Sequence, residues 1–129
     1  MNVILAIDAQ AFSSKTAKYA IEYAKRMGGD LVILSVLSRK DMEENPRLVK
    51  FTQIVMSRIK TEAGDEDVEA KTLLEKGQPV ETILIEADRV QAAAIILGPS
   101  NKTGLDKFII GSVSEGLIKG AKCPVIIAK

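Results

Sequence analysis

Three short and almost purely apolar runs restrict the possible fold more than any other feature of this sequence. They span Val3–Ile7, Leu31–Leu37 and Ala92–Leu97, and only Ser35 interrupts them. A strand with one solvent-facing side alternates apolar and polar residues, whereas a strand of a parallel sheet is buried on both faces and is continuously apolar. The three runs therefore predict central strands of a parallel sheet with helices on both of its faces.

Amphipathic segments connect these runs. Apolar residues recur in them at spacings of three and four, which is the period of a helix with one buried face. Their ends carry the usual signals: serine or asparagine before the first turn, proline within it, and glycine after the last turn. The expected helices extend from Ser13 or Ser14 to Gly28, from Pro46 to about Gly64, from Pro79 to Val90, and from Ser112 to Gly120. The charged segment Ser38–Glu44 is expected to be a loop.

Two weaker strands complete the pattern. Val68–Leu74 alternates weakly, as a less buried edge strand does, and Pro124–Ala128 is a short apolar run near the end of the chain. Five strands alternating with four helices indicate an α/β fold with a parallel sheet and helices on both faces. The residues alone leave the strand order open, and the flavodoxin-like order 2-1-3-4-5 is one option.

Length and composition narrow the class of protein. The 129 residues suit one domain, residues 1–129, and the net charge of +1 gives no reason to expect nucleic acid or an anionic membrane as a partner. No apolar run approaches the roughly 20 residues of a membrane span, and Val3–Ile7 is too short for a signal peptide. Cys123 is the only cysteine, so no intrachain disulfide forms, and it is expected to pack in the core. We therefore expect a cytoplasmic protein.

The chain contains no histidine. This absence removes the commonest general base, the commonest metal ligand, and every nucleophile arrangement that pairs serine or cysteine with histidine. A hydrolase would need carboxylates, lysine or a bound metal instead. The composition therefore counts against a dedicated catalyst.

The segment after the third run has the features of an anion site. The run ends at Gly98, a polar loop follows, and the last helix opens on Gly111-Ser112. Backbone N–H groups in the first turn of a helix have no partner within it and lie at the positive end of its dipole. From Gly98 to Lys129 there are five lysines against two acids, so this part of the chain is mildly basic. A phosphate site and an ordinary solvated surface both remain compatible with that charge.

The same segment carries a spaced motif. Gly98, Asn101, Gly111 and Ser112 follow the spacing G-x2-N-x9-G-S, which resembles the nucleotide loop G-x2-G-x9-G-S/T of the universal stress protein family. The ending from Gly111 to Ile127 also resembles that family. The resemblance covers nearly the whole chain and implies a three-layer, doubly wound α/β domain with strand order 3-2-1-4-5 and four helices. It also implies ATP or AMP as ligand and a homodimer formed through the last strand, Pro124–Ala128.

Under that implied order, the first and fourth strands are neighbours and the winding of the chain reverses between them. Ligands bind at such a switch point, outside the carboxyl ends of the strands. The resemblance assigns Asp8 to the ribose or the base, the backbone of Val36 to adenine, and the loop and helix start to the phosphates. The implied nucleotide-binding residues are Asp8, Ala9, Val36, Gly98, Asn101, Lys102, Gly111, Ser112, Val113 and Ser114.

Several of these residues also have purely structural interpretations. Asp8 is suited to capping the loop that follows it, and Val36 to filling a core position of a strand. The spacing Ser112-x-x-Glu115 is that of a capping box. The glycines are equally typical of turns between a strand and a helix.

Three functions therefore stay open. The first is an adenine-nucleotide-binding sensor or binding module of the stress response, in which Mg²⁺ or Mn²⁺ accompanies the triphosphate and is held mainly by phosphate oxygens and water. The second is a dimeric interaction module that has lost the nucleotide, because Asn101, Pro99, Ala9 and Ala94 depart from the family pattern. The third is an enzyme, a metal-assisted nucleotide or phosphate-ester hydrolase. Any ATP hydrolysis by the nucleotide-binding module should be slow, because no arginine follows Arg89.

Overall fold

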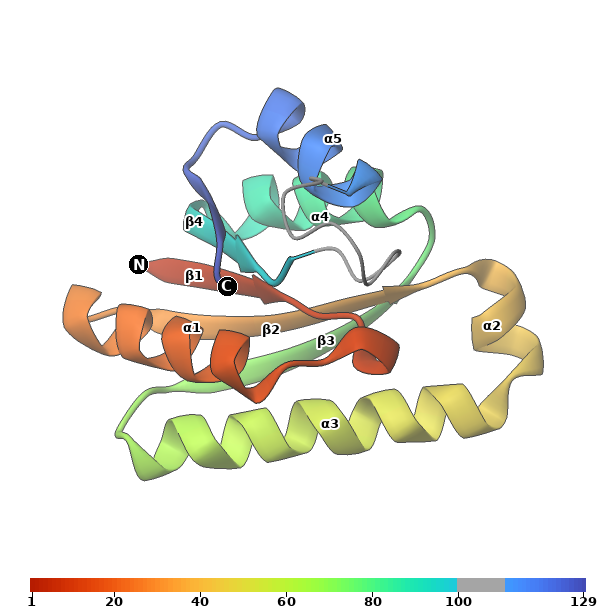
Figure 1. The fold of residues 1–129 in the computed structure, drawn as a ribbon, viewed down its shortest axis with the longest axis horizontal. Helices are drawn as coiled ribbons and strands as arrows, with labels where there is room; N and C mark the ends of the chain where they lie inside the picture. Colours follow the sequence, from red (N-terminus) through yellow and green to blue (C-terminus); the bar gives the residue numbers. More distant parts are fainter. Residues whose placement is uncertain (100–110) are drawn as a thin grey trace.

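A parallel sheet forms the centre of the computed structural model, which describes residues 1–99 and 111–129 (Figure 1). Its strand order is β3-β2-β1-β4-β5, and every neighbouring pair is parallel. The strands are β1 (Asn2–Ala6), β2 (Asp30–Leu37), β3 (Ala70–Lys76), β4 (Ala92–Leu97) and β5 (Val125–Ile127). The structure thus confirms the order implied by the resemblance and excludes the flavodoxin-like alternative.

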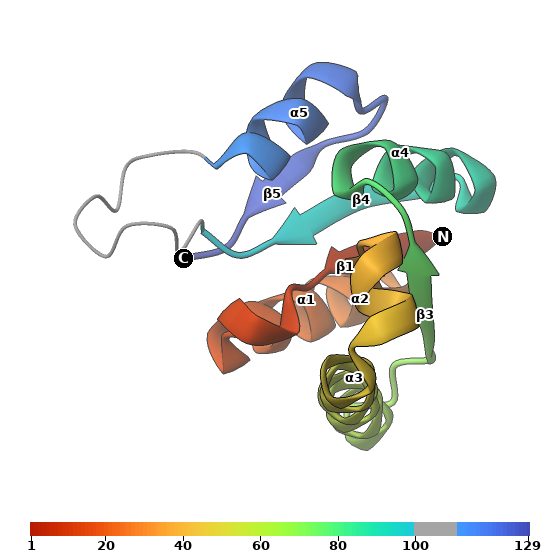
Figure 2. The same cartoon turned by 90° about the vertical axis from the view of Figure 1, so that its right-hand side faces the viewer.

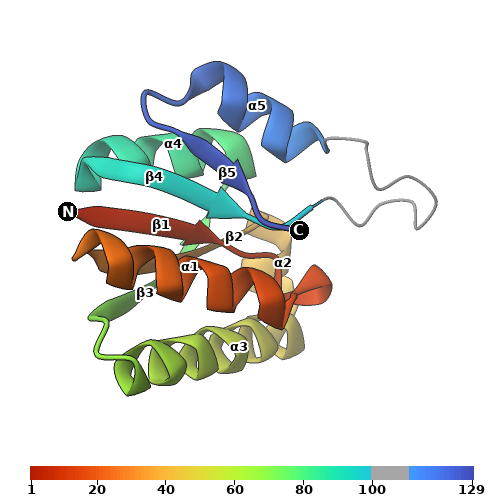
Figure 3. The same cartoon turned by 60° about the vertical axis from the view of Figure 1, so that its left-hand side comes forward.

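Helices cover both faces of this sheet. The four predicted helices are α1 (Ser14–Met27), α3 (Pro46–Asp65), α4 (Pro79–Val90) and α5 (Ser112–Gly120), and a short α2 (Arg39–Glu44) precedes α3. Figures 2 and 3 show α1 and α3 on one side of the sheet and α4 and α5 on the other. The protein therefore has the three layers expected of a doubly wound α/β fold.

Each face of the sheet has its own apolar core. Val3 and Leu5 of β1 pack with α1 and α3, whereas Ile4, which lies between them, packs with α4 and α5. In β2, Leu31 and Ile33 belong to the first core and alternate with residues of the second. This is the reason that the central strands are continuously apolar in sequence.

The segment Ser38–Glu44 corrects one expectation. It is not a loop, because Arg39–Glu44 forms α2. The hydroxyl oxygen of Ser38 accepts a hydrogen bond from the Asp41 N–H at 3.1 Å and caps this helix. The spacing of a serine three residues before an aspartate is an N-cap signal that the high charge of the segment obscured.

Two large apolar side chains of the helices are exposed. Met27 at the end of α1 and Phe51 in α3 are 47% and 48% exposed. In α3 the buried position next to Phe51 is taken by Thr52, whose hydroxyl donates to the Leu48 carbonyl at 2.7 Å. A threonine satisfied by its own helix behaves as a small core residue, which spacing alone does not reveal.

Two further expectations are corrected in detail. The third strand begins at Ala70, two residues later than predicted, although it does lie at a sheet edge. Cys123 is half-buried against the α4–α5 core, and this burial raises the pKa of its thiol. A raised pKa disfavours the reactive thiolate at neutral pH, which supports a packing role for Cys123.

Among the described residues, none of the helices has both the length and the apolar character to cross a membrane.

An acidic pair lies between β3 and α4. Glu86 of α4 is buried, and Arg89 donates to its carboxylate from Nε at 2.9 Å and from Nη2. Partial burial, the charge of Glu86 and a hydrogen bond with Glu86 together raise the pKa of Glu75, while the charge of Arg89 opposes the rise. Ionised Glu75 is therefore less favourable in the folded protein than in the unfolded chain.

Glu75→Gln is expected to raise the midpoint of thermal unfolding at neutral pH. A carboxyl group whose pKa is raised on folding contributes stability below its ordinary pKa, and this contribution is lost as the pH rises through the raised value. The neutral amide removes the cost of the ionised form, so the gain should shrink as the pH falls below the ordinary carboxyl pKa. Glu69→Gln, at an exposed position before β3, is the control and should change the midpoint little. Equal midpoints for wild type and E75Q at neutral pH would contradict this account.

Candidate functional site

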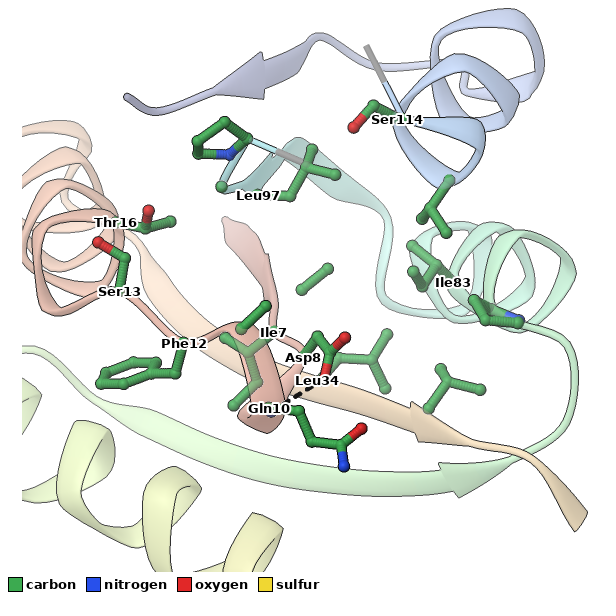
Figure 4. Close-up of a pocket in the computed structure, with 18 of the residues that line it drawn as sticks. Ile7, Asp8, Gln10, Phe12, Ser13, Thr16, Leu34, Ile83, Leu97 and Ser114 are labelled. Atoms are coloured by element: carbon green, nitrogen blue, oxygen red, sulfur yellow. Dashed lines mark hydrogen bonds between the residues drawn. The ribbon is translucent and has the colours of Figure 1, made fainter. Parts of the chain in front are cut away.

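A cavity of about 500 Å³ opens at the carboxyl ends of the central strands (Figure 4). Strands β1 and β4 are neighbours there, and the chain leaves them in opposite directions, toward β2 from the first and toward β5 from the second. The cavity therefore lies at the switch point of the sheet, where open α/β sheets bind their ligands. Its walls come from the ends of β1, β2 and β4 and from the starts of α1, α4 and α5.

The floor of the cavity is apolar. Leu34 of β2, Ile83 of α4 and Leu97 of β4 are buried and line it, and Val36 adds a half-buried side chain. Figure 4 shows Leu34 and Ile83 on the side of the cavity opposite Ser13 and Thr16 of α1. Such a surface suits a planar, largely apolar ring system, whose burial it would favour.

Asp8 provides charge beside this floor. It is exposed, and among the described residues that line the cavity it is the one with a charged side chain. Its Oδ1 atom accepts a hydrogen bond from the Gln10 N–H at 3.0 Å and caps a 3-10 turn at Ala9–Ala11. The structural interpretation of Asp8 as a loop cap is thus confirmed, and the same carboxylate faces the cavity with acceptor capacity for ligand hydroxyl groups.

The start of α5 forms the opposite wall. Gly111 is the N-cap, with φ −69° and ψ 166°, and no side chain caps the helix. The first donor within the helix is the Glu115 N–H, which donates to the Gly111 carbonyl at 2.9 Å. The N–H groups of Ser112, Val113 and Ser114 precede it and have no partner inside the helix. They lie at the positive end of the helix dipole, beside the cavity, where an anion is favoured.

The predicted capping box is absent. Ser112 is the first residue of α5 rather than its N-cap, so its hydroxyl is one position too late for that motif. The Glu115 carboxylate is paired instead with Lys119, one turn later in the helix, at 3.0 Å. The first-turn amides therefore stay available to a ligand.

Thr16 is a cavity residue that the sequence did not reveal. It is buried, and its hydroxyl donates to the Ala128 carbonyl at 3.3 Å. A Cβ atom added to Gly98 would lie 3.0 Å from Thr16 Oγ1, which is a tight contact, and the backbone of Gly98 has no positive φ. The signal for Thr16 was a polar residue within the apolar stripe of α1, beside Ala17 and one turn before Ala20.

The structure brings most of the predicted site residues together. Those that line the cavity are Asp8, Val36, Gly98, Gly111, Ser112, Val113 and Ser114. Ala9 is buried in the core next to α1 and does not line the cavity, and Asn101 and Lys102 lie outside the described residues. Of the four departures from the family pattern, Pro99 lines the cavity, whereas Ala94 is fully buried within β4.

Within residues 1–99 and 111–129, no three cysteine, aspartate or glutamate side chains gather closely enough to hold a metal ion. The cavity itself presents hydroxyl groups, backbone amides and the single carboxylate of Asp8 in its described lining. This donor set suits an anionic ligand with ring and hydroxyl groups better than a bare cation.

Comparison with known proteins gives consistent matches over the full length. The sequence model described as the universal stress protein family matches residues 1–129. A universal stress protein of Methanocaldococcus jannaschii is 28% identical over 137 residues, which cover 98% of this chain and 81% of that protein. The structure of a universal stress protein from Archaeoglobus fulgidus superposes with a TM-score of 0.84 at 25% identity, covering 100% of this chain and 98% of that one. A structure of the A. fulgidus protein in complex with dAMP has a TM-score of 0.80 at 23% identity, with the same coverage.

Proposed function

This chain belongs to the universal stress protein family, and from that membership we propose that it binds an adenine nucleotide, ATP or AMP, in the cavity at the switch point of the sheet. The observation that carries the proposal is the position of α5, whose uncapped first turn faces the same cavity as Asp8 and an apolar floor. The cavity thus combines a surface suited to phosphate, the first turn of α5, with Asp8 for the ribose and an apolar floor for the base. The dAMP bound to the A. fulgidus protein is a ligand of this chemical class.

Each part of the nucleotide has proposed partners. The adenine ring lies against Leu34 and Val36, the ribose hydroxyls donate to Asp8, and the phosphates accept from the first-turn amides of α5. Ser112 and Ser114 add hydroxyl groups near the same phosphates. A divalent cation such as Mg²⁺ or Mn²⁺ would be held by the triphosphate and water, since Asp8 is the one carboxylate in the described lining.

We further propose that the chain acts as a homodimeric stress-response sensor. Strand β5 is an edge of the sheet, and Val125, Ile126 and Ile127 are all half-buried. An apolar edge strand is normally covered or paired, and pairing with β5 of a second copy satisfies its free backbone groups. Nucleotide occupancy would then be read out by partners of the dimer rather than by catalysis.

A second candidate is a dimeric interaction module without a nucleotide. Pro99 favours it, because it lines the cavity directly after Gly98 and has no N–H to offer a phosphate. Hydrolysis is the least supported function. The described lining holds one carboxylate, and no arginine follows Arg89 to stabilise a transferred phosphoryl group.

The test is titration calorimetry with ATP and AMP in the presence of magnesium, together with analysis of what the denatured protein releases. Asp8→Ala is expected to weaken nucleotide binding about 10- to 100-fold, since a hydrogen bond to a charged group is lost. The affinity of Asp8→Asn should lie between those of Asp8→Ala and wild type, because asparagine retains the cap to Gln10 but not the charge. Asp30→Asn is the matched control, because Asp30 begins β2 and so lies at the end of this strand that is far from the cavity.

Two outcomes separate the candidate functions. Release of one adenine nucleotide per chain from the denatured protein supports the nucleotide-binding sensor. So does calorimetric binding of ATP or AMP that weakens in the Asp8 variants but not in Asp30→Asn. A purified protein that releases no nucleotide and gives no heat with ATP or AMP would overturn that function and leave the interaction module.

A further inference from the structure

Helix α3 carries an exposed side that no described element covers. This α3 outer face, as we name it, consists of Lys50, Ile54, Ser57, Arg58 and Glu62, which line one shallow groove along the helix. Ile54 is 44% exposed, and Phe51 beside it is 48% exposed. Figures 1 and 3 show α3 as the outermost helix of its layer, on the side of the sheet that ends with β3. A partly apolar strip is therefore open to solvent on a long helix.

The charges along α3 and the four residues that follow it are sorted by sign. Residues 46–60 contain four bases and no acid, and residues 61–69 contain five acids and no base. All nine side chains are exposed. Bases near the N-terminus of a helix and acids near its C-terminus both oppose the helix dipole. The stability of α3 itself therefore does not account for this order.

Few of these charges are neutralised within the protein. Glu66 pairs with Lys25 of α1 at 3.0 Å. In the part of the chain that the structure describes, Arg47, Lys50, Glu62 and Asp65 form no ion pair. The helix thus has a basic end and an acidic end, and both can form ion pairs with a partner whose charges run in the opposite order along its surface.

A second copy of α3 in antiparallel orientation has that order. Lys50 and Glu62 lie six residues on either side of Met56, and Arg47 and Asp65 lie nine residues on either side. A twofold axis can run between the two helices at the level of Met56. It then places Lys50 of each copy opposite Glu62 of the other, and Arg47 of each copy opposite Asp65 of the other. At a period of 3.6 residues, Arg47, Lys50, Ile54 and Asp65 also share the outward side of the helix.

The centre of the same arrangement is suited to packing. Ile54 and Arg58 lie two residues on either side of Met56, so the apolar stem of each Arg58 covers Ile54 of the other copy. Ser57 lies next to the axis, and its small side chain permits close approach of the two helices. Antiparallel helix dipoles also attract one another. The ion pairs, the small side chain of Ser57 and the apolar contact therefore all favour the same register, centred at the level of Met56.

From these observations we propose that the α3 outer face is a self-association surface, which binds α3 of a second copy of this chain in antiparallel orientation. The contact is small and its ion pairs are exposed, so the association is weak and depends on salt. It is distinct from pairing through β5, which lies at the other edge of the sheet. It is also independent of nucleotide binding.

Disulfide trapping tests this geometry directly. In a Cys123→Ser background, Ser57→Cys is expected to form a disulfide-linked dimer under mild oxidation at low salt. Helices about 8–10 Å apart bring facing Cα atoms within the roughly 4.4–6.8 Å that a disulfide spans. Glu81→Cys, at an exposed position in the first turn of α4, is the control, because α4 lies on the opposite face of the sheet. Equal cross-linking of the two variants would overturn the proposal.

Charge exchange tests the register, and analytical ultracentrifugation without oxidant measures the result. Lys50→Glu and Glu62→Lys should each weaken self-association about tenfold at low salt, because each replaces two attractive contacts with repulsive ones. The double variant K50E/E62K should recover the self-association of wild type. An equimolar mixture of the two single variants should also recover it, because their mixed dimers have only attractive contacts. Single variants that associate as strongly as wild type, or a double variant that does not recover, would contradict the register.

Discussion

Gly111→Val is expected to lower nucleotide affinity about 100-fold, equivalent to about 2.7 kcal/mol, with a much smaller loss of stability. Gly111 is the N-cap of α5 and lines the cavity directly before the free first-turn amides. A branched side chain at this position occupies space that a phosphate needs in order to approach those amides. The backbone of Gly111 is extended, with φ −69° and ψ 166°, so valine is sterically allowed there.

The stability of this variant must be measured beside its affinity. Glycine is already a moderate N-cap, so its loss should destabilise the protein by at most about 1 kcal/mol. Gly111→Ala is the graded control, and its single methyl group should weaken binding less than valine does. If calorimetry finds wild-type affinity in folded G111V, the phosphates do not lie at the start of α5.

The second large effect concerns folding and compares two helical glycines. Gly116→Ala is expected to lower the free energy of unfolding by about 1–3 kcal/mol, as overpacking of a close contact does. A Cβ atom on Gly116 of α5 would lie 2.8 and 2.9 Å from the two γ-methyl groups of Val80 in α4. Because both methyl groups of Val80 are too close, a change of its rotamer cannot relieve the contact, and the two helices must separate.

Gly64→Ala should have the opposite sign. A Cβ atom on Gly64, near the end of α3, would meet nothing within 4 Å. Alanine there gains helix propensity and should raise the free energy of unfolding by up to about 1 kcal/mol. Urea denaturation of both variants measures the contrast, and Val80→Ala combined with Gly116→Ala should recover part of the loss. Stabilisation by Gly116→Ala alone would show that α4 and α5 are not packed this closely.

Much of this fold was predictable because it depends on local periodicity. The runs Val3–Ile7, Leu31–Leu37 and Ala92–Leu97 become the three central strands, and Asn45-Pro46 begins α3 with the Leu48 N–H donating to Asn45 Oδ1 at 3.2 Å. Strand order was not available from the residues themselves and came from the family resemblance. A six-residue helix such as α2 gives too short a pattern to be recognised by period.

The site was predictable only as far as the strand order was. Once β1 and β4 are neighbours, Asp8, Gly98 and Gly111 must meet at one end of the sheet. Thr16 could not be found in this way, because its partner Ala128 lies 112 residues away in the sequence. Glu86 was missed for a different reason: its partner Arg89 is only three residues away, but an acidic residue of an amphipathic helix is usually exposed, whereas Glu86 is buried.

The hydrogen bond between Thr16 and Ala128 has a thermodynamic consequence. Ala128 directly follows β5, and its N–H donates to the Leu97 carbonyl at 2.8 Å while its own carbonyl accepts from Thr16 inside the cavity. One peptide segment thus connects Thr16, which lines the cavity, with β5 at the edge of the sheet. Any ligand that shifts this segment changes the affinity of the edge for an added strand, and linkage requires that strand to change the affinity for the ligand by the same factor.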